Sequence, residues 1–191
     1  MNYAVEIANA AGQDRAAVYV RPGGLVIALA DGAGGTVGGG RAALAVIEAV
    51  GASPTADFAA LLEALDVQQR GRGLTTAIVL AVTAAGIAGC GAGDSGAWLV
   101  GDEITDLCEG MPTKPFVGEG CFPFAIEAGP LGALTLLVAS DGLFKYAPRR
   151  HIARIARWPD LALAARALVD LARLPSGGLS DDVAVVLCRA G

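Results

Sequence analysis

The chain has 191 residues, and its formal net charge is −5. This length is sufficient for a sizeable hydrophobic core, so we expect a single domain over residues 1–191. The net negative charge argues against nucleic acid as a partner, because binding to a phosphate backbone requires clustered Lys and Arg.

Other features bear on where the protein acts. Residues 74–93 form an uncharged stretch long enough for a membrane span, but turn residues divide it into β-rich runs at 76–83 and 87–90. A buried hairpin is therefore predicted, and we expect no membrane partner. The first six residues lack the basic and apolar regions of a secretion signal. The four cysteines show no metal-binding spacing, which favours buried free thiols in a reducing, cytoplasmic compartment.

The predicted elements follow from hydrophobic periodicity and from turn residues. Strands are expected at residues 5–8, 16–21, 25–30, 76–83, 87–90, 97–100, 104–107, 133–139 and 183–189. Helices are expected at residues 41–50, from 53–54 to about 70, 148–157 and 159–171. The first two strands are expected to pair with each other, and residues 109–123 are expected to form a surface loop. This order lacks regular strand–helix alternation, so it predicts mixed or antiparallel sheets packed on each other with helix pairs outside.

Aspartates stand where three of the apolar strands begin or end. Asp31 follows strand 25–30, Asp141 follows strand 133–139, and the pair Asp181-Asp182 precedes strand 183–189. Strands that end at one rim would gather these carboxylates, and a cluster of like charges is tolerable only if a cation is bound. No His/Cys group competes for this role. The sequence therefore predicts a hard, oxygen-preferring ion, Mg²⁺ or Mn²⁺, rather than zinc.

The glycine-rich segment Asp31-Gly32-Ala33-Gly34-Gly35 has an alternative interpretation as a phosphate-binding loop. A nucleotide-binding loop of the Walker type continues with Gly-Lys-Ser/Thr, which is missing here. A dinucleotide-binding loop is also disfavoured, because the leading carboxylate would repel a pyrophosphate. A leading aspartate with small residues behind it is better suited to binding a metal and leaving room for substrate.

Six motifs, in this order along the chain, resemble those of the metal-dependent serine/threonine protein phosphatases of type 2C. They are Gln13-Asp14, Asp31-Gly32-Ala33-Gly34-Gly35, Gly73-Leu74-Thr75-Thr76-Ala77, Gly93-Asp94-Ser95, Ser140-Asp141-Gly142-Leu143 and Asp181-Asp182. The resemblance implies an α+β fold, namely a four-layer α-β-β-α sandwich of two mainly antiparallel sheets with a two-metal centre between them.

The resemblance also implies roles for individual residues. Asp31 would bridge two ions, and Gly32 would contribute its backbone carbonyl. Asp141 and Asp181 would complete the shell of one ion, Asp14 would hold a coordinated water, and Asp94 would help to bind a third, weaker ion. Two divalent ions activate water for in-line attack on phosphorus, so no protein nucleophile is needed. Asp31, Asp141 and Asp181 are then the residues on which catalysis depends.

The sequence departs from the family pattern in its substrate-binding residues. No arginine precedes the first acidic motif, because residues 9–12 read Asn-Ala-Ala-Gly. Gln13 stands where glutamate is common, Ala33 where some relatives have histidine, and Gly96 where arginine is usual. Two cations remain as candidates for holding the substrate phosphate: Arg15, next to Asp14, and Lys114, in the long loop.

The sequence-based hypothesis is thus a compact bacterial-type phosphatase that hydrolyses phosphoserine or phosphothreonine on proteins. We expect a monomer that acts against a serine/threonine kinase. Two alternatives remain open: a phosphatase-like module that binds phosphoproteins without efficient turnover, and a phosphomonoesterase acting on a small molecule.

Overall fold

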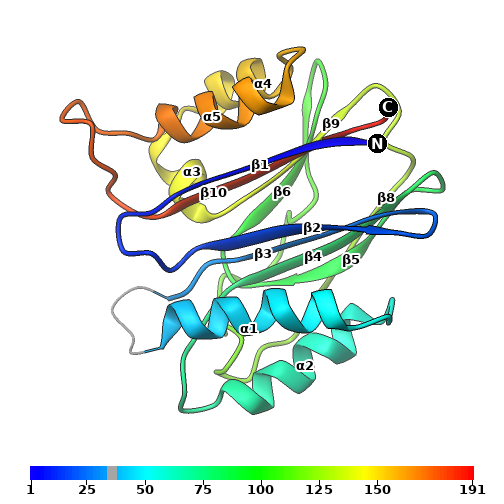
Figure 1. The fold of residues 1–191 in the computed structure, drawn as a ribbon, viewed down its shortest axis with the longest axis vertical. Coiled ribbons are helices and arrows are strands. Elements are labelled where there is room, and N and C mark those ends of the chain that lie inside the picture. The colour runs from blue at the N-terminus through cyan, green and yellow to red at the C-terminus, as the bar shows by residue number, and fades with distance from the viewer. Residues whose placement is uncertain (34–37) are drawn as a thin grey trace.

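Two five-stranded sheets form the centre of the molecule (Figure 1). We describe it from a computed structural model that covers residues 1–33 and 38–191. Gly34 and Gly35 of the glycine-rich motif therefore lie outside the described residues. The strands are β1 (Asn2–Ala8), β2 (Arg15–Arg21), β3 (Gly24–Ala30), β4 (Ala77–Thr83), β5 (Ile87–Ala92), β6 (Gly96–Val100), β7 (Ile104–Asp106), β8 (Phe124–Ala128), β9 (Thr135–Ala139) and β10 (Val183–Arg189). The helices are α1 (Gly39–Ala52), α2 (Phe58–Gln69), α3 (Asp141–Tyr146), α4 (Arg149–Ala156) and α5 (Leu161–Leu171).

The strand order is β1-β10-β9-β6-β7 in the first sheet and β2-β3-β4-β5-β8 in the second. Neighbouring strands pair antiparallel throughout. Helices α1 and α2 cover the outer face of the second sheet, while α3, α4 and α5 cover the first (Figure 1). The expected four-layer α+β sandwich is therefore confirmed, with three helices rather than a pair on one side.

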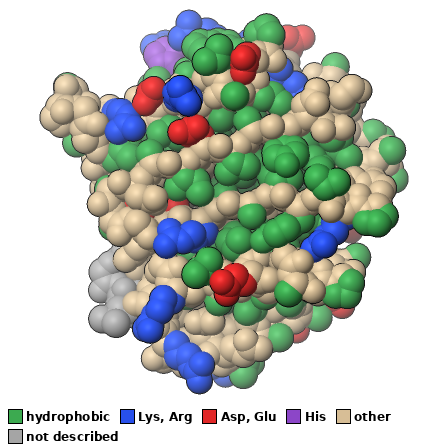
Figure 2. All heavy atoms as spheres, in the orientation of Figure 1, with side chains coloured by type: hydrophobic (Ala, Val, Ile, Leu, Met, Phe, Trp, Pro, Cys, Tyr) green, Lys and Arg blue, Asp and Glu red, His purple; other side chains and the backbone are tan. Residues whose placement is uncertain are grey.

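Each pair of adjacent layers encloses its own hydrophobic cluster. The cluster between the sheets includes Ile27, Leu80 and Val186, all fully buried. Figure 2 shows hydrophobic side chains along the seam between the edge strands of the two sheets. The predicted hairpin at residues 74–93 is confirmed, because β4 and β5 pair antiparallel. Within the described residues, no helix is long and apolar enough to cross a membrane.

The expected pairing of the first two strands is wrong. β1 pairs with β10, and β2 pairs with β3, so the two strands are edges of different sheets. The reason is that β3 and β10 are almost continuous buried apolar runs, and each offers a complete antiparallel ladder to its neighbour. Residues 9–14 cross from one sheet to the other, and this crossing becomes important for the metal centre.

Three smaller expectations also differ from the structure. The second helix begins at Phe58 rather than at residues 53–54, because the carboxylate of Asp57 caps it by accepting the Ala60 N–H. Strand β8 and helix α3 have no counterpart among the predicted elements, and both are short, with 5 and 6 residues. Segment 109–123 is not simply a surface loop, because Val117 is fully buried and pairs with Thr75.

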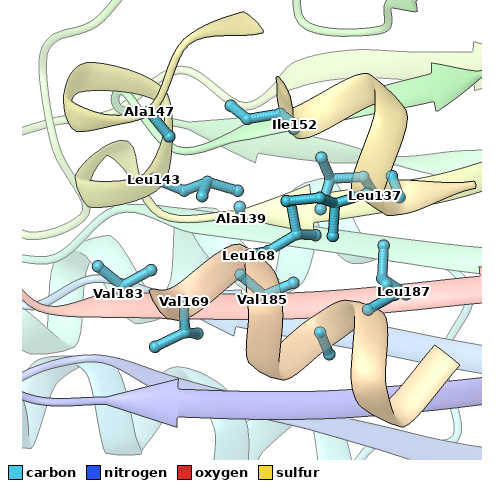
Figure 3. Close-up of a cluster of buried hydrophobic side chains, with 14 of the residues drawn as sticks. Leu137, Ala139, Leu143, Ala147, Ile152, Leu168, Val169, Val183, Val185 and Leu187 are labelled. Atoms are coloured by element: carbon cyan, nitrogen blue, oxygen red, sulfur yellow. The ribbon is translucent and has the colours of Figure 1, made fainter. Parts of the chain in front are cut away.

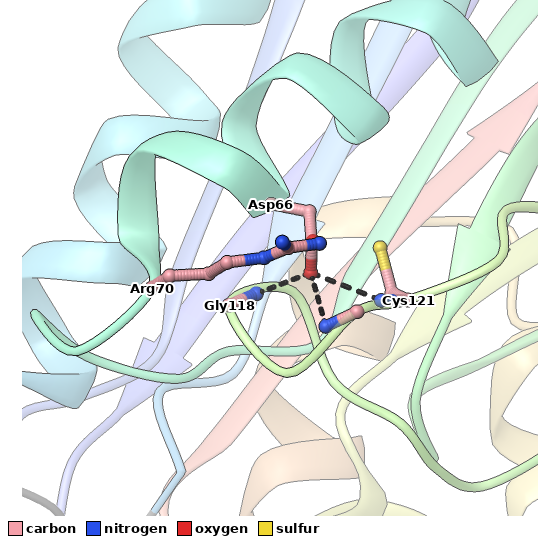
Figure 4. A network of polar contacts seen from close by, with 5 residues as sticks. Asp66, Arg70, Gly118 and Cys121 are labelled. Carbon is pink, nitrogen blue, oxygen red and sulfur yellow. Dashed lines mark hydrogen bonds and ion pairs between the residues drawn. The ribbon is translucent and has the colours of Figure 1, made fainter.

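Asp66 holds this segment against the body of the molecule (Figure 4). Its Oδ1 accepts the backbone N–H groups of Gly118, Gly120 and Cys121, at 2.8–2.9 Å. Its Oδ2 receives the guanidinium of Arg70 at 3.0 Å. Burial alone would raise the pKa of Asp66, but these backbone hydrogen bonds outweigh it and lower the pKa to about 2.

The four cysteines are free thiols, and only Cys108 is not buried.

Helix α3 is fixed by the cluster between the first sheet and its helices (Figure 3). Leu143 is fully buried there beside Ala139 and Val183, and the ring of Phe144 lies 4.5 Å from that of Trp98, centroid to centroid. Burying a leucine contributes roughly 1.5–3 kcal/mol, so this short helix has little freedom to shift. It begins at Asp141, whose position is therefore well defined.

Candidate metal centre

The predicted ligands lie at one end of the sandwich, the left end in Figure 1. Strands β2 and β3 pair with each other. Asp14 directly precedes β2, and Asp31 directly follows β3. Asp141 comes two residues after β9 ends, and Asp181 two residues before β10 begins. Because paired antiparallel strands run in opposite directions, the end of one strand meets the start of the next at the same rim. Residues far apart in sequence thus come to one place.

Asp14 is buried without any hydrogen-bonding partner for its carboxylate. The residue is 1% exposed, and neither oxygen has a partner in the structure. Burial raises the pKa of Asp14; the nearby Ser140 hydroxyl and Asp31 carboxyl group oppose that rise, and the charges of Asp182 and Asp141 add to it. A buried carboxylate left in this state is costly. Asp14 is therefore poised to receive either a proton or a cation.

Asp31 carries the stronger perturbation. Burial raises its pKa well above the ordinary value, and the neighbouring carboxylates of Asp14, Asp141 and Asp181 raise it further. This electrostatic coupling links Asp31 to three other predicted ligands. Desolvation combined with like charge is the pattern expected where anionic side chains await a positive ligand.

Threonines from the predicted Gly-Leu-Thr-Thr-Ala motif hold the backbone of Asp31. The Asp31 carbonyl accepts the Thr75 hydroxyl and the Thr76 N–H, both at 2.8 Å, and the Asp31 N–H donates to the Thr76 hydroxyl at 3.0 Å. The Thr76 hydroxyl also bonds the Ser95 hydroxyl at 2.6 Å. The motif is visible in the sequence, but the role of its threonines is not. They connect Asp31 with the residue that follows Asp94.

Two glycines allow backbone to approach backbone around the centre. A Cβ on Gly142 would lie 2.0 Å from the carbonyl oxygen of Asp182, and one on Gly32 would lie 2.4 Å from the carbonyl carbon of Gly39. Neither position admits a side chain without displacing main chain. Glycine is therefore needed after both Asp31 and Asp141 for the same reason: the segments that carry these carboxylates pack closely against other backbone.

The two members of the pair Asp181-Asp182 have different surroundings. Asp182 is buried, and its carboxylate accepts backbone N–H groups from the crossing between the sheets, namely those of Ala10, Ala11, Gly12, Gln13 and Asp14. These hydrogen bonds outweigh burial and lower the pKa of Asp182. Asp181 is half-buried, and its charge acts on Asp31. Asp182 thus uses both carboxylate oxygens to bind backbone N–H groups. Asp181 accepts the Asp182 N–H at Oδ1, at 3.0 Å, so its Oδ2 is the oxygen proposed for an ion.

Lys145 is a member of the site that sequence analysis did not identify. Its ammonium makes a close ion pair with Oδ2 of Asp141, one helical turn earlier, and lies 3.8 Å from Oδ2 of Asp94. Oδ1 of Asp141 is buried and has no partner. The spacing of four residues on a helix was the signal available in the sequence. Asp94 is half-buried; burial, followed by the charge of Asp141, raises its pKa.

The chemistry of this donor set fits a divalent cation. Three buried carboxylate oxygens, from Asp14 and Asp141, lack a partner, and Asp31 lies among them with a raised pKa. In the described part of the chain, no group of three or more His, Cys, Asp or Glu side chains is arranged so that it could hold a metal ion. The fit therefore rests on the unpaired oxygens and on the electrostatic coupling. Oxygen donors of this kind favour Mg²⁺ or Mn²⁺.

The two candidate substrate cations lie in different surroundings. The guanidinium of Arg15 donates to the carbonyls of Gly12 and Asp14, so it braces the crossing between the sheets. Lys114 is exposed, and its ammonium lies 5.2 Å from the ring centroid of Phe116. Phe116 in turn lies beside Gly93, next to Asp94. Both assignments stay predictions.

A cavity of about 220 Å³ opens beside Asp94. Its lining includes Trp98, Met111 and Phe144, and it lies between the carboxylates and segment 109–123. Larger cavities of about 510 and 520 Å³ lie at the other end of the second sheet, around Thr83, away from every predicted ligand. Because it adjoins Asp94, the small cavity is placed to receive part of a substrate.

Several solved structures with the same fold are bacterial phosphatases. A mutant of a bacterial serine phosphatase superposes with a TM-score of 0.86 at 18% identity, covering 100% of this chain and 99% of that chain. The phosphatase PstP/Ppp of Mycobacterium tuberculosis has a TM-score of 0.76 at 24% identity, covering 97% of each chain. Stp1 of Staphylococcus aureus has a TM-score of 0.78 at 16% identity, covering 99% of this chain and 94% of that chain.

A structure of the PstP catalytic domain, also at 24% identity, holds two manganese ions. No protein-family model and no curated protein matches the sequence. At these identities the comparisons show the fold, which is that of the bacterial serine/threonine phosphatases over the whole chain.

Proposed function

We propose that this protein is a metal-dependent phosphatase that removes phosphate from phosphoserine or phosphothreonine on proteins. The observation that carries the proposal is the set of buried, unpartnered carboxylate oxygens of Asp14 and Asp141 around Asp31, at one end of this fold. The similar bacterial structures include serine/threonine phosphatases, and one of them contains two manganese ions. Two Mn²⁺ or Mg²⁺ ions are proposed here.

Asp31 is proposed to bridge the two ions, with the Gly32 carbonyl as a further ligand. Asp141, through its unpaired Oδ1, and Asp181 would complete the shell of one ion. The carboxylate of Asp14 would orient a water. When bound, such a pair of ions neutralises phosphoryl oxygens and supplies a water nucleophile at neutral pH.

The hydroxyls nearest the carboxylates are already engaged by the protein. The Ser140 hydroxyl accepts the Ala184 N–H at 2.9 Å, and the Ser95 hydroxyl bonds Thr76. Both serines are buried. Attack by water rather than by a serine nucleophile is consistent with these bonds. The Ser140–Ala184 bond also holds the end of β9 against the start of β10, and so fixes the segments that carry Asp141 and Asp181.

A second candidate function is phosphoprotein binding without efficient turnover. It is favoured by the substrate side of the site, because no arginine stands in residues 9–12 and Arg15 is engaged with backbone carbonyls. Without a firm grip on the phosphate, positioning for in-line attack would be poor.

The test is hydrolysis of p-nitrophenyl phosphate and of a phosphothreonine peptide, with Mn²⁺, with Mg²⁺ and with excess chelator. We expect metal-dependent release of phosphate from the peptide and its loss in Asp31→Asn. Asp102→Asn is the control, because Asp102 is a fully exposed carboxylate whose ion-pair partner among the described residues is Arg157.

The other outcomes separate the alternatives. Turnover of p-nitrophenyl phosphate without the peptide would favour a small-molecule phosphomonoesterase. Peptide binding without phosphate release would favour the binding module. Full turnover in excess chelator, or by Asp31→Asn, would contradict the proposed two-metal mechanism.

A further inference from the structure

Lys145 places a positive charge between two of the predicted metal ligands. Its ammonium contacts Oδ2 of Asp141 and lies 3.8 Å from Oδ2 of Asp94. A lysine is protonated at neutral pH in the absence of strong perturbation, and here both neighbours are carboxylates. Lys145 is one of only two lysines in the chain, the other being Lys114.

The position of this ammonium is set by the helix and not only by the ion pair. Lys145 lies on α3, where Leu143 is fully buried and Phe144 packs against Trp98. Figure 3 shows Leu143 directed into the cluster beneath the helix. Asp141 begins the same helix, and residues four apart on a helix lie side by side. The side chain of Lys145 is 53% exposed, so its charged end reaches the acidic site from the solvent side.

The two oxygens of Asp141 therefore have different surroundings. Oδ1 is buried without a partner, whereas Oδ2 is already occupied by the ammonium. On Asp94, Oδ2 is the oxygen within 4 Å of the ammonium, and the charge of Asp141 acts on the same carboxylate. An additional divalent ion shared by Asp94 and Asp141 would need these same oxygens, and it would meet the ammonium at close range. The repulsion between a divalent and a monovalent cation at such distances is substantial in a partly buried site.

We propose that the ammonium of Lys145 stands in the place of a third metal ion, so that this chain holds two divalent ions and Asp94 binds Lys145 instead of metal. This inference rests on the proposed two-metal centre and revises the role that the sequence resemblance implied for Asp94. It assigns Lys145 a positioning role: it neutralises Asp94 and holds Oδ2 of Asp141, which leaves Oδ1 for the two-metal centre.

The experiment counts bound Mn²⁺ by equilibrium dialysis, with free Mn²⁺ measured by electron paramagnetic resonance. It compares the natural chain with Lys145→Met, Lys145→Arg and the double variant Lys145→Met/Asp94→Ala. Lys114→Met is the matched control, because it removes the other lysine charge from an exposed position outside the carboxylate cluster. Circular dichroism verifies that each variant is folded.

We expect about two ions per chain in the natural protein and about three in Lys145→Met, the additional one bound weakly. Lys145→Arg, which retains the charge, and Lys114→Met should remain at about two ions, and the double variant should return to about two. Asp94→Ala alone should also leave about two ions bound, which provides a test that does not depend on the folding of Lys145→Met.

Each other outcome overturns the inference in a recognisable way. Three ions in the natural chain, falling to two in Asp94→Ala, would show that Lys145 does not exclude the third ion. Two ions in both the natural chain and Lys145→Met would show that Lys145 is not what limits the number. Absence of any bound ion from the natural chain would instead refute the proposed metal centre, and with it this inference.

Discussion

Asp182 and Gln13 are 169 residues apart in the sequence, yet the carboxylate of Asp182 accepts the backbone N–H of Gln13. The same carboxylate holds four further N–H groups in the crossing that leads into Asp14. Asp182 directly precedes β10 of the first sheet, and it therefore connects this strand to the segment that leads into β2 of the second sheet. Asp182 fixes the segment that leads into Asp14, a predicted ligand. It can therefore affect metal binding without contacting the ion.

We expect Asp182→Ala to weaken Mn²⁺ binding by about 10–100-fold, because Asp14 would lose the backbone frame that presents it. Isothermal titration with Mn²⁺ measures the effect. Asp182→Asn should be milder, since one carbonyl oxygen can still accept part of the N–H set. The exposed Asp102→Ala is the control. Unchanged Mn²⁺ affinity in Asp182→Ala would show that Asp14 does not depend on this frame.

A second prediction concerns the acid stability conferred by Asp66. Its folded pKa is about 2, below the ordinary 3.8, so the folded state favours the ionised form. The resulting stabilisation, about 2 kcal/mol, is fully present above about pH 4 and is lost as the pH falls towards 2. Asp66→Asn should lose this stability at pH 7 and show a flatter dependence between pH 4 and 2.

Urea unfolding of the natural chain and of Asp66→Asn at several pH values tests this prediction. Asp102→Asn serves as the matched control, because it removes an exposed carboxylate with no comparable backbone contacts. If the natural chain and Asp66→Asn lost stability in parallel between pH 4 and 2, Asp66 would not be the group responsible.

The third prediction uses metal binding as a contribution to folding stability. An ion that binds only the folded chain stabilises it by about 2.7 kcal/mol at 100 times its Kd, which corresponds to a rise in Tm of about 5–10 °C for a chain of this size. We expect this rise with Mn²⁺ in the natural chain and little of it in Asp31→Asn. Differential scanning calorimetry with and without Mn²⁺ provides the measurement. An equal rise in both proteins would place the stabilising ion elsewhere.

The fourth prediction separates the two candidate substrate cations. Lys114 is exposed beside Phe116, so Lys114→Ala should raise KM for a phosphopeptide more than it lowers kcat. Arg15 braces the carbonyls of Gly12 and Asp14, so Arg15→Ala should weaken Mn²⁺ binding in addition to any effect on KM. Steady-state kinetics at saturating Mn²⁺, together with titration of the metal, tests both. Unchanged KM in both variants would mean that neither residue holds the phosphate.

The sequence alone was informative where a local pattern has one physical solution. Strand β10 was predicted with the bounds that it has, because residues 183–189 are almost entirely buried and apolar. The β4–β5 hairpin followed in the same way from two apolar runs and a turn. The aspartates at the strand ends were also visible, since a charged residue that interrupts a buried run must leave the core there.

The tertiary structure alone decided which segments meet. Pairing of β1 with β10 rather than β2 is a long-range choice, and a strand's own sequence does not specify its partner. The same holds for the site: the difference between Asp181 and Asp182 arises because only Asp182 faces the backbone of residues 10–14. The sequence determined that carboxylates would leave the core at the strand ends. Packing decided that Asp14 would be buried without a partner and that Lys145 would lie against Asp94, because burial and charge pairing depend on neighbours brought together only by folding.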